Sequence, residues 1–299
     1  MEKNKDISGW ICLDKPSGMS SNQAMVKVRK IFGCKTGYVG TLDPFATGVL
    51  PIALGETRKF IPYISETQKT YAFTMEFGNT TDTLDKDGKI TETSPKIPKK
   101  NEIAEVLDFF LGNQDQMPPI FSAIKIKGKR ACDRVRSGET ITLSTRKIHV
   151  FSISLTGVRD NEADLEVTCS KGTYIRSLAR DIAEKLGSVA YVKSLRRKKS
   201  GFFSINDAIT LEKLLQIKDT DKSLHYLFSQ ESPLDDIPAL CVNKDNVVKL
   251  QNGLYIPYVD EKLGSTNVLI FEDPAGKFAG IGFLSEDGVM IPVRMCAFN

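Results

Sequence analysis

The sequence is poor in the residues that most often build metal and hydrolase sites. Its two histidines, His149 and His225, do not lie near a pair of cysteines, which argues against a structural zinc site. A Ser-His-Asp hydrolase would depend on one of the same two residues, and neither stands in a motif of that class. A phosphate loop of the form G-x-x-x-x-G-K-[ST] is also missing. Any chemistry is therefore expected from other side chains, without a metal.

Close cysteine spacing and long apolar runs are missing as well. The six cysteines form no CxxC pair, which predicts reduced, mostly buried thiols and a cytoplasmic protein. The first residues, Met-Glu-Lys-Asn-Lys-Asp, are polar and lack the apolar core of a secretion signal. No uninterrupted apolar run approaches the ~20 residues of a membrane span, so no membrane partner is expected.

The composition is that of a folded protein with a mild basic excess. Hydrophobic residues make up 41% of 299 residues, enough for one large domain or for a large and a small one. The net charge is +4, and basic residues gather at 125–130 and 196–199. Each run taken alone is typical of a solvated charged surface. Two such runs beside the motifs described below favour contacts with nucleic acid phosphates.

Hydrophobic periodicity predicts a mixture of helices and strands. Ser20-Ser-Asn-Gln23 fits a capping box before a helix that Gly33 can end. From Tyr71 to Phe77 apolar and polar residues alternate, as in a half-buried strand. Further helices are expected at 103–110 and from Gly172 onward, and further strands at 148–156 and 163–169. This mixture favours an α+β or mixed α/β fold.

The chain divides into a large and a small domain, predicted at residues 1–237 and 238–299. Residues 79–101 are rich in Asp, Thr, Lys and Pro, which predicts a flexible insertion within the first domain. Residues 217–238 are interpreted as a connector. Short strands punctuated by glycine follow, so the second domain is expected to be β-rich.

One carboxylate, Asp43, lies in an unusually constrained segment. Gly40, Pro44 and Gly48 surround it, and glycine and proline favour sharp bends and close backbone approach. An Asp in such a loop either forms the turn or is a positioned reactive group. The local pattern by itself favours the turn.

The segment from Gly37 to Lys59 resembles the catalytic motif of the TruB family of RNA pseudouridine synthases. Other segments resemble further motifs of that family, in the family's order, over roughly residues 9–208. They are Leu13-Asp-Lys15-Pro16-Ser-Gly18, Lys69-Thr-Tyr71, Gly78-Asn-Thr-Thr-Asp82-Thr-Leu-Asp85, Pro118 to Lys125, Arg134 to Gly138, Cys169 to Asp181 and Leu195-Arg-Arg197.

The resemblance implies a fold and an activity. The fold would be α+β, with a mixed, largely antiparallel sheet flanked by helices and a C-terminal RNA-binding domain of PUA type. The tail's short strands fit equally well an extra sheet that completes the fold. The activity would be isomerisation of uridine to pseudouridine at position 55 in the T loop of tRNA, by a cofactor-independent monomer that recognises the T-loop stem.

The resemblance also implies a role for several residues. Asp43 would be the nucleophile, Arg176 its counter-ion, and Tyr71 the ring that stacks on the flipped base and helps remove its C5 proton. Without the motifs, Arg176 would be a helix-surface residue and Tyr71 a core residue. The positions of Tyr174, Leu195 and Lys15 correspond to substrate-binding positions of the family, and at these too ordinary structural roles are the alternative.

Two positions depart from the family's pattern. Tyr38 stands where the family has a histidine that fills the space of the flipped nucleotide, and Phe121 stands where a tyrosine is usual. Tyrosine can stack and donate a hydrogen bond but cannot become cationic. We therefore expect flipping to persist with altered RNA binding.

Two alternative functions stay open at this point. Tyr38 favours an RNA-binding or RNA-folding protein with weak or lost catalysis, whereas Asp43, Tyr71 and Arg176 favour an enzyme. A guide-directed relative acting on other RNAs is the second alternative, and the short N terminus and the lack of a Lys-rich tail argue against it.

Overall fold

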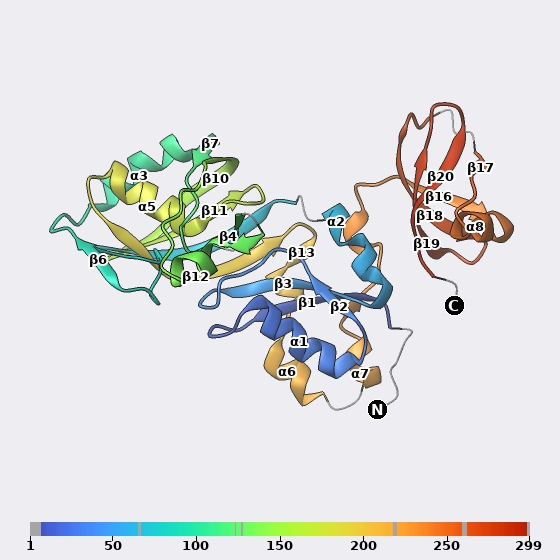
Figure 1. Cartoon of the computed structure of the whole chain (residues 1–299), viewed down its shortest axis with the longest axis horizontal. Helices are drawn as coiled ribbons and strands as arrows, with labels where there is room; N and C mark the ends of the chain where they lie inside the picture. Colours follow the sequence, from blue (N-terminus) through green and yellow to red (C-terminus); the bar gives the residue numbers. More distant parts are fainter. Residues whose placement is uncertain are drawn as a thin grey trace.

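The computed structural model describes residues 7–64, 67–122, 124–126, 128–217, 220–258 and 262–297. A long sheet with helices forms most of the molecule, and a smaller β-rich domain lies at one end (Figure 1). No helix in these ranges is both long and apolar enough to cross a membrane. All six cysteines are free thiols, but Cys241 is exposed, so the expectation of mostly buried thiols holds for Cys12 and Cys169 better than for the others.

The main sheet has 11 strands and is mixed but largely antiparallel, as expected. Among the described strands of this sheet, β1 with β14 and β3 with β12 are the parallel pairs. The order along the sheet is β14 (Ile209–Thr210), β1 (Gly9–Lys15), β3 (Thr47–Leu54), β12 (Ala190–Ser200), β4 (Lys69–Phe77), β11 (Glu162–Cys169), β10 (Arg146–Arg159) and β7 (Gly112–Gln116). Three short strands lie off this path: β2 (Thr36–Tyr38), β13 (Phe203–Ser204) and β15 (Leu227–Phe228).

The alternation predicted for β4 is present. Tyr71, Phe73, Met75 and Phe77 are buried, while the residues between them are half-buried. Because side chains alternate across a strand, the four residues share one face and pack into the main core. That core extends along the sheet beneath the helices, so the middle of the sheet is a rigid platform.

The helices α1 (Ser21–Phe32) and α5 (Ile175–Lys185) contribute their apolar sides to this core. The predicted capping box at Ser20 and Gln23 starts α1, and Gly33 ends it with φ 65°. Smaller helical pieces pack on both faces of the sheet: η1 (Gly55–Phe60), α2 (Ile61–Ile64), α3 (Lys100–Val106), η2 (Leu107–Phe110), η3 (Ile205–Asp207), α6 (Leu211–Gln216), α7 (Thr220–Leu224) and η4 (Ser232–Leu234). The helix expected at 103–110 is thus an α-helix that tightens into a 3-10 turn.

The segment 79–101, expected to be an insertion, contains a hairpin. Strands β5 (Asn79–Thr81) and β6 (Ile90–Thr93) pair antiparallel, with a register shift between Thr80 and Thr81, and residues 82–89 connect them. This connection is tied to the main sheet, because the amide of Val192 donates to the carbonyl of Leu84 and the amide of Lys86 donates to the carbonyl of Val192. Flexibility of the segment stays a prediction.

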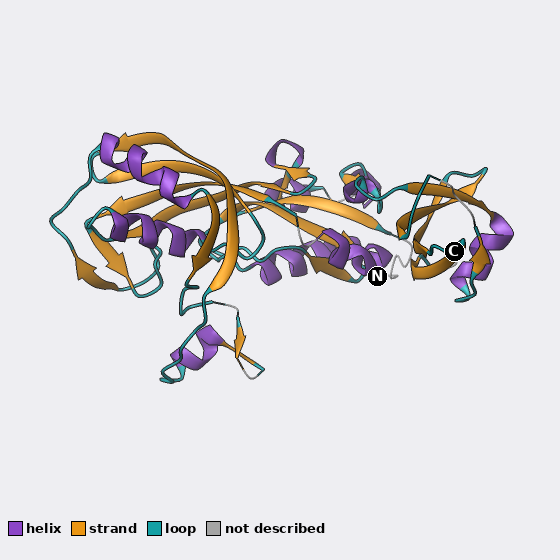
Figure 2. Ribbon diagram, turned by 90° about the horizontal axis from the view of Figure 1, so that it is seen from above, coloured by secondary structure: helices purple, strands orange, loops and turns teal. Residues whose placement is uncertain are grey.

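A second small unit stands off the main body (Figure 2). It contains β8 (Lys125–Ile126), β9 (Lys129–Arg130) and α4 (Ala131–Arg136). Arg134 pairs with Glu139 at 2.8 Å, within the unit itself.

The C-terminal domain is a 5-stranded sheet, in agreement with the β-rich second domain that the sequence predicts. Its order is β16 (Ala239–Asn243), β18 (Thr266–Asp273), β19 (Lys277–Leu284), β20 (Val289–Met295) and β17 (Ile256–Pro257). The helix α8 (Lys244–Gln251), whose start is capped by Asn243, was not predicted from the sequence. The expected connector also contains structure, since β15 extends the main sheet and Leu234 is fully buried.

Candidate active site

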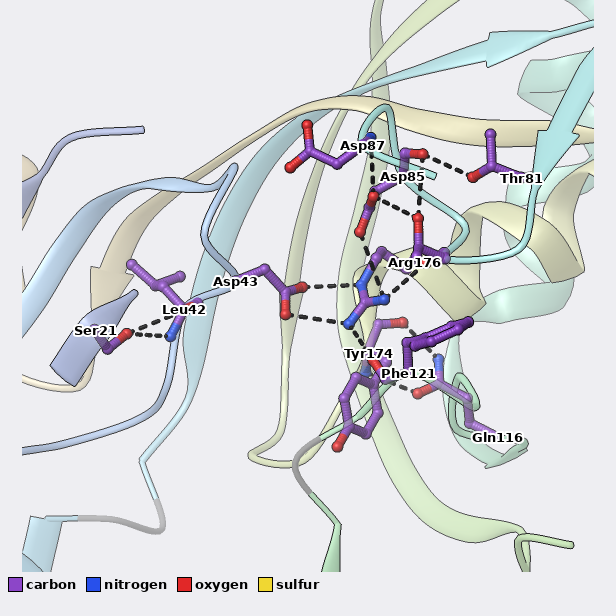
Figure 3. A network of polar contacts seen from close by, with 11 residues as sticks. Ser21, Leu42, Asp43, Thr81, Asp85, Asp87, Gln116, Phe121, Tyr174 and Arg176 are labelled. Carbon is purple, nitrogen blue, oxygen red and sulfur yellow. Dashed lines mark hydrogen bonds and ion pairs between the residues drawn. The ribbon is translucent and has the colours of Figure 1, made fainter. Parts of the chain in front are cut away.

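The loop that carries Asp43 joins β2 to β3, at the middle of the molecule. Ser21, in the first turn of α1, holds this loop through Leu42. Its hydroxyl accepts from the amide of Leu42 at 2.8 Å and donates to the carbonyl of Leu42 at 3.1 Å (Figure 3). The carbonyl of Asp43 itself accepts from the amide of Ala46 at 3.1 Å, which closes a tight turn. The carboxylate is therefore held in place while 32% of its side chain stays exposed.

Arg176 lies in the first turn of α5, and two nitrogens of its guanidinium group bond this carboxylate. Its Nε donates to Oδ2 of Asp43 at 2.9 Å, and Nη2 donates to Oδ1 at 3.1 Å (Figure 3). The guanidinium also donates to the carbonyls of Thr83 at 2.7 Å and Phe121 at 3.1 Å. Arg176 is 4% exposed, so the surface position considered as its alternative is wrong. Paired, bidentate hydrogen bonds of this kind are strong and directional.

Asp85 adds a second carboxylate that the sequence analysis did not single out. Its Oδ2 lies 3.6 Å from Nη1 of Arg176, on the side away from Asp43 (Figure 3). Thr83 donates its hydroxyl to the other oxygen at 2.6 Å, and the amide of Asp87 donates to the same oxygen at 3.1 Å. Burial raises the pKa of Asp85, and these bonds and Arg176 oppose that rise. The signal was present as the last residue of the motif Gly78 to Asp85.

Tyr71 forms part of the floor beside this loop. Its side chain is 7% exposed and belongs to the main core. This is the core position that the sequence analysis gave as the alternative to a role in the site. Burial raises the pKa of its phenol; Arg197 opposes that effect, and the charge of Asp43 adds to it. Tyr71 shares its buried cluster with Leu42 and Phe45 of the Asp43 loop, so it is both a core residue and a neighbour of that loop.

Lys15 takes a different position from the one a direct substrate contact requires. Its side chain is fully buried, and its ammonium donates to the carbonyls of Pro16 at 2.9 Å, Met19 at 2.8 Å and Pro44 at 3.3 Å. The pKa of the Lys15 ammonium is lowered to about 8, chiefly by burial, and the nearby charge of Asp43 partly opposes this effect. Since Pro44 follows Asp43 directly, the geometry favours a role in supporting the loop.

Tyr174 is the N-cap residue of α5, and Leu195 lies on β12. Gln116 holds the backbone of Tyr174, with its side chain accepting from the amide at 2.8 Å and donating to the carbonyl at 3.0 Å. The guanidinium of Arg146 lies over the ring of Tyr174 at 5.3 Å. Leu195 is 7% exposed and pairs with Phe73 across the sheet.

The two departures from the family pattern have different structural settings. Tyr38, at the end of β2, is half-buried against the main core, and no polar contact within the described ranges joins it to Asp43. Phe121 contacts Arg176 through its backbone carbonyl, so this bond does not depend on the missing tyrosine hydroxyl.

The structure shows that part of the run 196–199 is not free to contact phosphates, while contact of its exposed residues with phosphates stays a prediction. Arg196 forms a bidentate pair with Asp14 at 2.8 and 3.1 Å, and Lys198 pairs with Glu166 at 2.6 Å. Arg197 is 1% exposed. Most of this run is therefore already paired or buried, which linear charge density cannot reveal. Of the other run, Lys127 lies outside the described residues.

Comparison with known proteins places the chain in a family. Residues 26–175 match the model of the TruB family pseudouridylate synthase N-terminal domain, and residues 176–237 match that of the tRNA pseudouridylate synthase B C-terminal domain. The tRNA pseudouridine synthase B of Zymomonas mobilis is 47% identical over 253 residues, covering 83% of this chain and 84% of that protein. The enzyme of the same name from Bradyrhizobium diazoefficiens is 38% identical and covers 97% of this chain and 86% of that protein.

Solved structures give the same fold. A Cbf5-Nop10-Gar1 complex contains a chain that matches with a TM-score of 0.71 at 23% identity, covering 97% of this chain and 84% of that one. An H/ACA RNP bound to a substrate RNA containing 2'-deoxyuridine contains another, with a TM-score of 0.70 at 21% identity, covering 97% and 85%. These identities support the shared fold and no more. Together with the sequence relatives and the family models, they lead to one conclusion: this chain belongs to the TruB family of pseudouridylate synthases.

Proposed function

We propose that this protein isomerises uridine to pseudouridine at position 55 in the T loop of tRNA, with Asp43 as the nucleophile. The observation that carries the proposal is the partly exposed Asp43 carboxylate, held by the bidentate guanidinium of a buried Arg176. Related proteins named tRNA pseudouridine synthase B supply the substrate class.

The reaction breaks the bond between ribose C1′ and uracil N1 and forms a new bond from C1′ to C5. The proton leaves C5 and N1 takes up a proton, so the product is an isomer of the substrate and no redox cofactor or energy source is required. A carboxylate nucleophile can divide this difficult exchange into two easier steps through a covalent intermediate.

Arg176 supports this role because it stabilises Asp43 as an anion. Each carboxylate oxygen has a second lone pair, so one hydrogen bond per oxygen leaves Asp43 able to attack. Asp85 and the carbonyls of Thr83 and Phe121 occupy further guanidinium donors and fix the orientation of Arg176.

Tyr71 is proposed to stack on the uracil after the nucleotide has been flipped from the RNA and to assist removal of the C5 proton. Tyr174 and Leu195 would contact the base from the sides, and Tyr38 would contribute to RNA binding. Flipping a nucleotide out of a folded loop costs a few kcal/mol, which RNA contacts must offset.

The remaining proposals concern the whole protein. We infer that it acts as a monomer in the cytoplasm and recognises the T-loop stem without a guide RNA. Residues 238–299 would form a separate RNA-binding domain of PUA type, with completion of the fold as the alternative.

The test is tritium release from a T-loop stem-loop RNA labelled at uridine C5, incubated with purified protein and no added cofactor or guide. Release with wild type, and none from an RNA with cytidine at position 55, is the expected result. RNA binding without release would contradict catalysis and would favour the RNA-binding alternative, with Tyr38 as the first residue to revert.

A further inference from the structure

Arg197 is a buried cation that the mechanism above does not use. It lies on β12, it is 1% exposed, and none of the ion pairs in the described part of the chain involves it. Burying a charge without an opposite charge is unfavourable, so its other contacts must offset the cost. Those contacts lead to the Asp43 loop.

The guanidinium bonds the two arms of that loop. Its Nη2 donates to the carbonyl of Gly40 at 2.8 Å, and its Nε donates to the carbonyl of Val49 at 2.7 Å. Gly40 precedes Asp43 and Val49 follows it, so one side chain connects the segment that enters the loop with the segment that leaves it. A guanidinium presents its donors in a fixed planar fork, whereas an ammonium is a single point.

Two glycines allow the loop to lie directly against Arg197. A Cβ at Gly48 would lie 2.2 Å from the backbone carbonyl oxygen of Arg197, and one at Gly40 would lie 3.0 Å from its Nη1. Both glycines have positive φ, 102° and 69°. The close approach is therefore built into the backbone of the loop.

Arg197 also faces the second residue of the proposed chemistry. In the pairing of β12 with β4 it lies opposite Tyr71, and its charge opposes the effect of burial on the phenol. The same side chain thus contacts the loop of the proposed nucleophile and neighbours the proposed stacking ring.

We propose that Arg197 is a positioning residue that sets the distance between Asp43 and Tyr71 by clamping both arms of the Asp43 loop. This inference rests on the proposed function. Arg176 orients the carboxylate itself, and Arg197 orients the backbone that carries it. A purely structural role, in which Arg197 only contributes to folding, is the competing explanation.

The experiment compares wild type with Arg197→Lys and Arg197→Met in single-turnover tritium release at saturating enzyme. RNA Kd and urea unfolding are measured on the same preparations. We expect Arg197→Lys to lower the single-turnover rate on the order of 100-fold with RNA Kd unchanged, since small displacements of reacting groups have effects of that size. Arg196→Lys is the matched control, because Arg196 is its neighbour but pairs with Asp14.

Amide hydrogen exchange of residues 40–49 provides a readout that does not depend on catalysis. Faster exchange confined to this loop in both Arg197 variants supports the clamp. Wild-type rate in a fully folded Arg197→Lys, or a loss that only follows the unfolded fraction, would overturn it. If wild type itself released no tritium, the proposed function would fail, and the exchange of residues 40–49 would still decide the role of Arg197.

Discussion

At the scale of single residues, the Asp43 loop is surrounded by cations that bind carbonyl oxygens. Lys15 bonds three carbonyls, Lys69 bonds the carbonyl of Thr67 at 2.6 Å, and Arg197 bonds two. Their charges are not cancelled by ion pairs in the described ranges. These cations lie around the loop of the partly exposed Asp43 carboxylate, which favours the approach of RNA phosphates.

The buried lysines give a prediction about pH. Burial, and then the charge of Arg197, lower the pKa of Lys69 from 10.5 to about 8. Between these values the unfolded chain binds a proton that the folded chain has lost, so this residue makes the free energy of unfolding rise as pH rises from 8 to 10.5. In urea unfolding, the free energy of unfolding of wild type minus that of Lys69→Met should increase as pH rises over this interval. A difference that stays constant would contradict the assignment.

Tyr38 gives a second prediction at this scale. Histidine can carry a positive charge and tyrosine cannot. If residue 38 occupies the space that the flipped nucleotide leaves in the RNA, Tyr38→His is expected to change RNA affinity or turnover. Filter binding and tritium release at pH 6 and pH 8 measure both quantities. Unchanged affinity and unchanged turnover would remove Tyr38 from the RNA-binding surface.

The family resemblance predicted the pair of Asp43 and Arg176, although 133 positions separate them in the sequence. It did not predict Asp85 or Arg197 as parts of the site. Asp85 acts through a turn whose shape depends on Leu84 at φ 60°, an unusual conformation for leucine. Arg197 was interpreted as part of a surface charge run because burial is a property of the folded sheet and not of the run.

At the scale of elements, the connection between β5 and β6 reaches the site through one turn. Thr83 and Asp85 both contact Arg176, so the hairpin and α5 are coupled at the guanidinium. Periodicity could predict α1, α5 and β4 because their apolar faces are long. It could not predict the hairpin or α8, because segments this short contain too few residues to show a period.

Gly88 tests this coupling at a distance from the chemistry. A Cβ there would lie 2.3 Å from the hydroxyl of Thr83 and 2.5 Å from Oδ1 of Asp82, so Gly88→Ala must displace the turn. Turnover is expected to fall by about 10- to 100-fold as Arg176 loses its fixed orientation. Gly264→Ala is the control, because its Cβ would meet nothing within 4 Å. Equal turnover of Gly88→Ala and wild type would show that the turn does not orient Arg176.

At the scale of the whole molecule, the C-terminal sheet packs against η1 of the large domain. Phe60 and Phe278 meet edge to face at 5.3 Å between ring centroids, and Lys59 donates to the carbonyl of Met295 at 3.1 Å. Leu269 and Ile281 of the small domain share one buried cluster with Trp10 of the large one. The orientation of the small domain is therefore set by apolar packing, which sequence motifs do not encode.

Removing that packing gives a prediction about stability. Phe278 is 7% exposed, so Phe278→Ala should lower the free energy of unfolding by about 3–5 kcal/mol. Val293→Ala is a suitable control, because Val293 is 39% exposed. Urea unfolding measures both. A loss no larger than that of the control would mean that the two domains are not held together at this contact.

The measurement that tests the central claim most directly is single-turnover tritium release from the T-loop stem-loop by wild type and Asp43→Asn. The substitution keeps the size of the side chain but removes the negative charge, and circular dichroism and RNA Kd show whether folding and binding persist. We predict full release by wild type and none by Asp43→Asn, with RNA binding retained. Release by Asp43→Asn at the wild-type rate would contradict the assignment of Asp43 as the nucleophile.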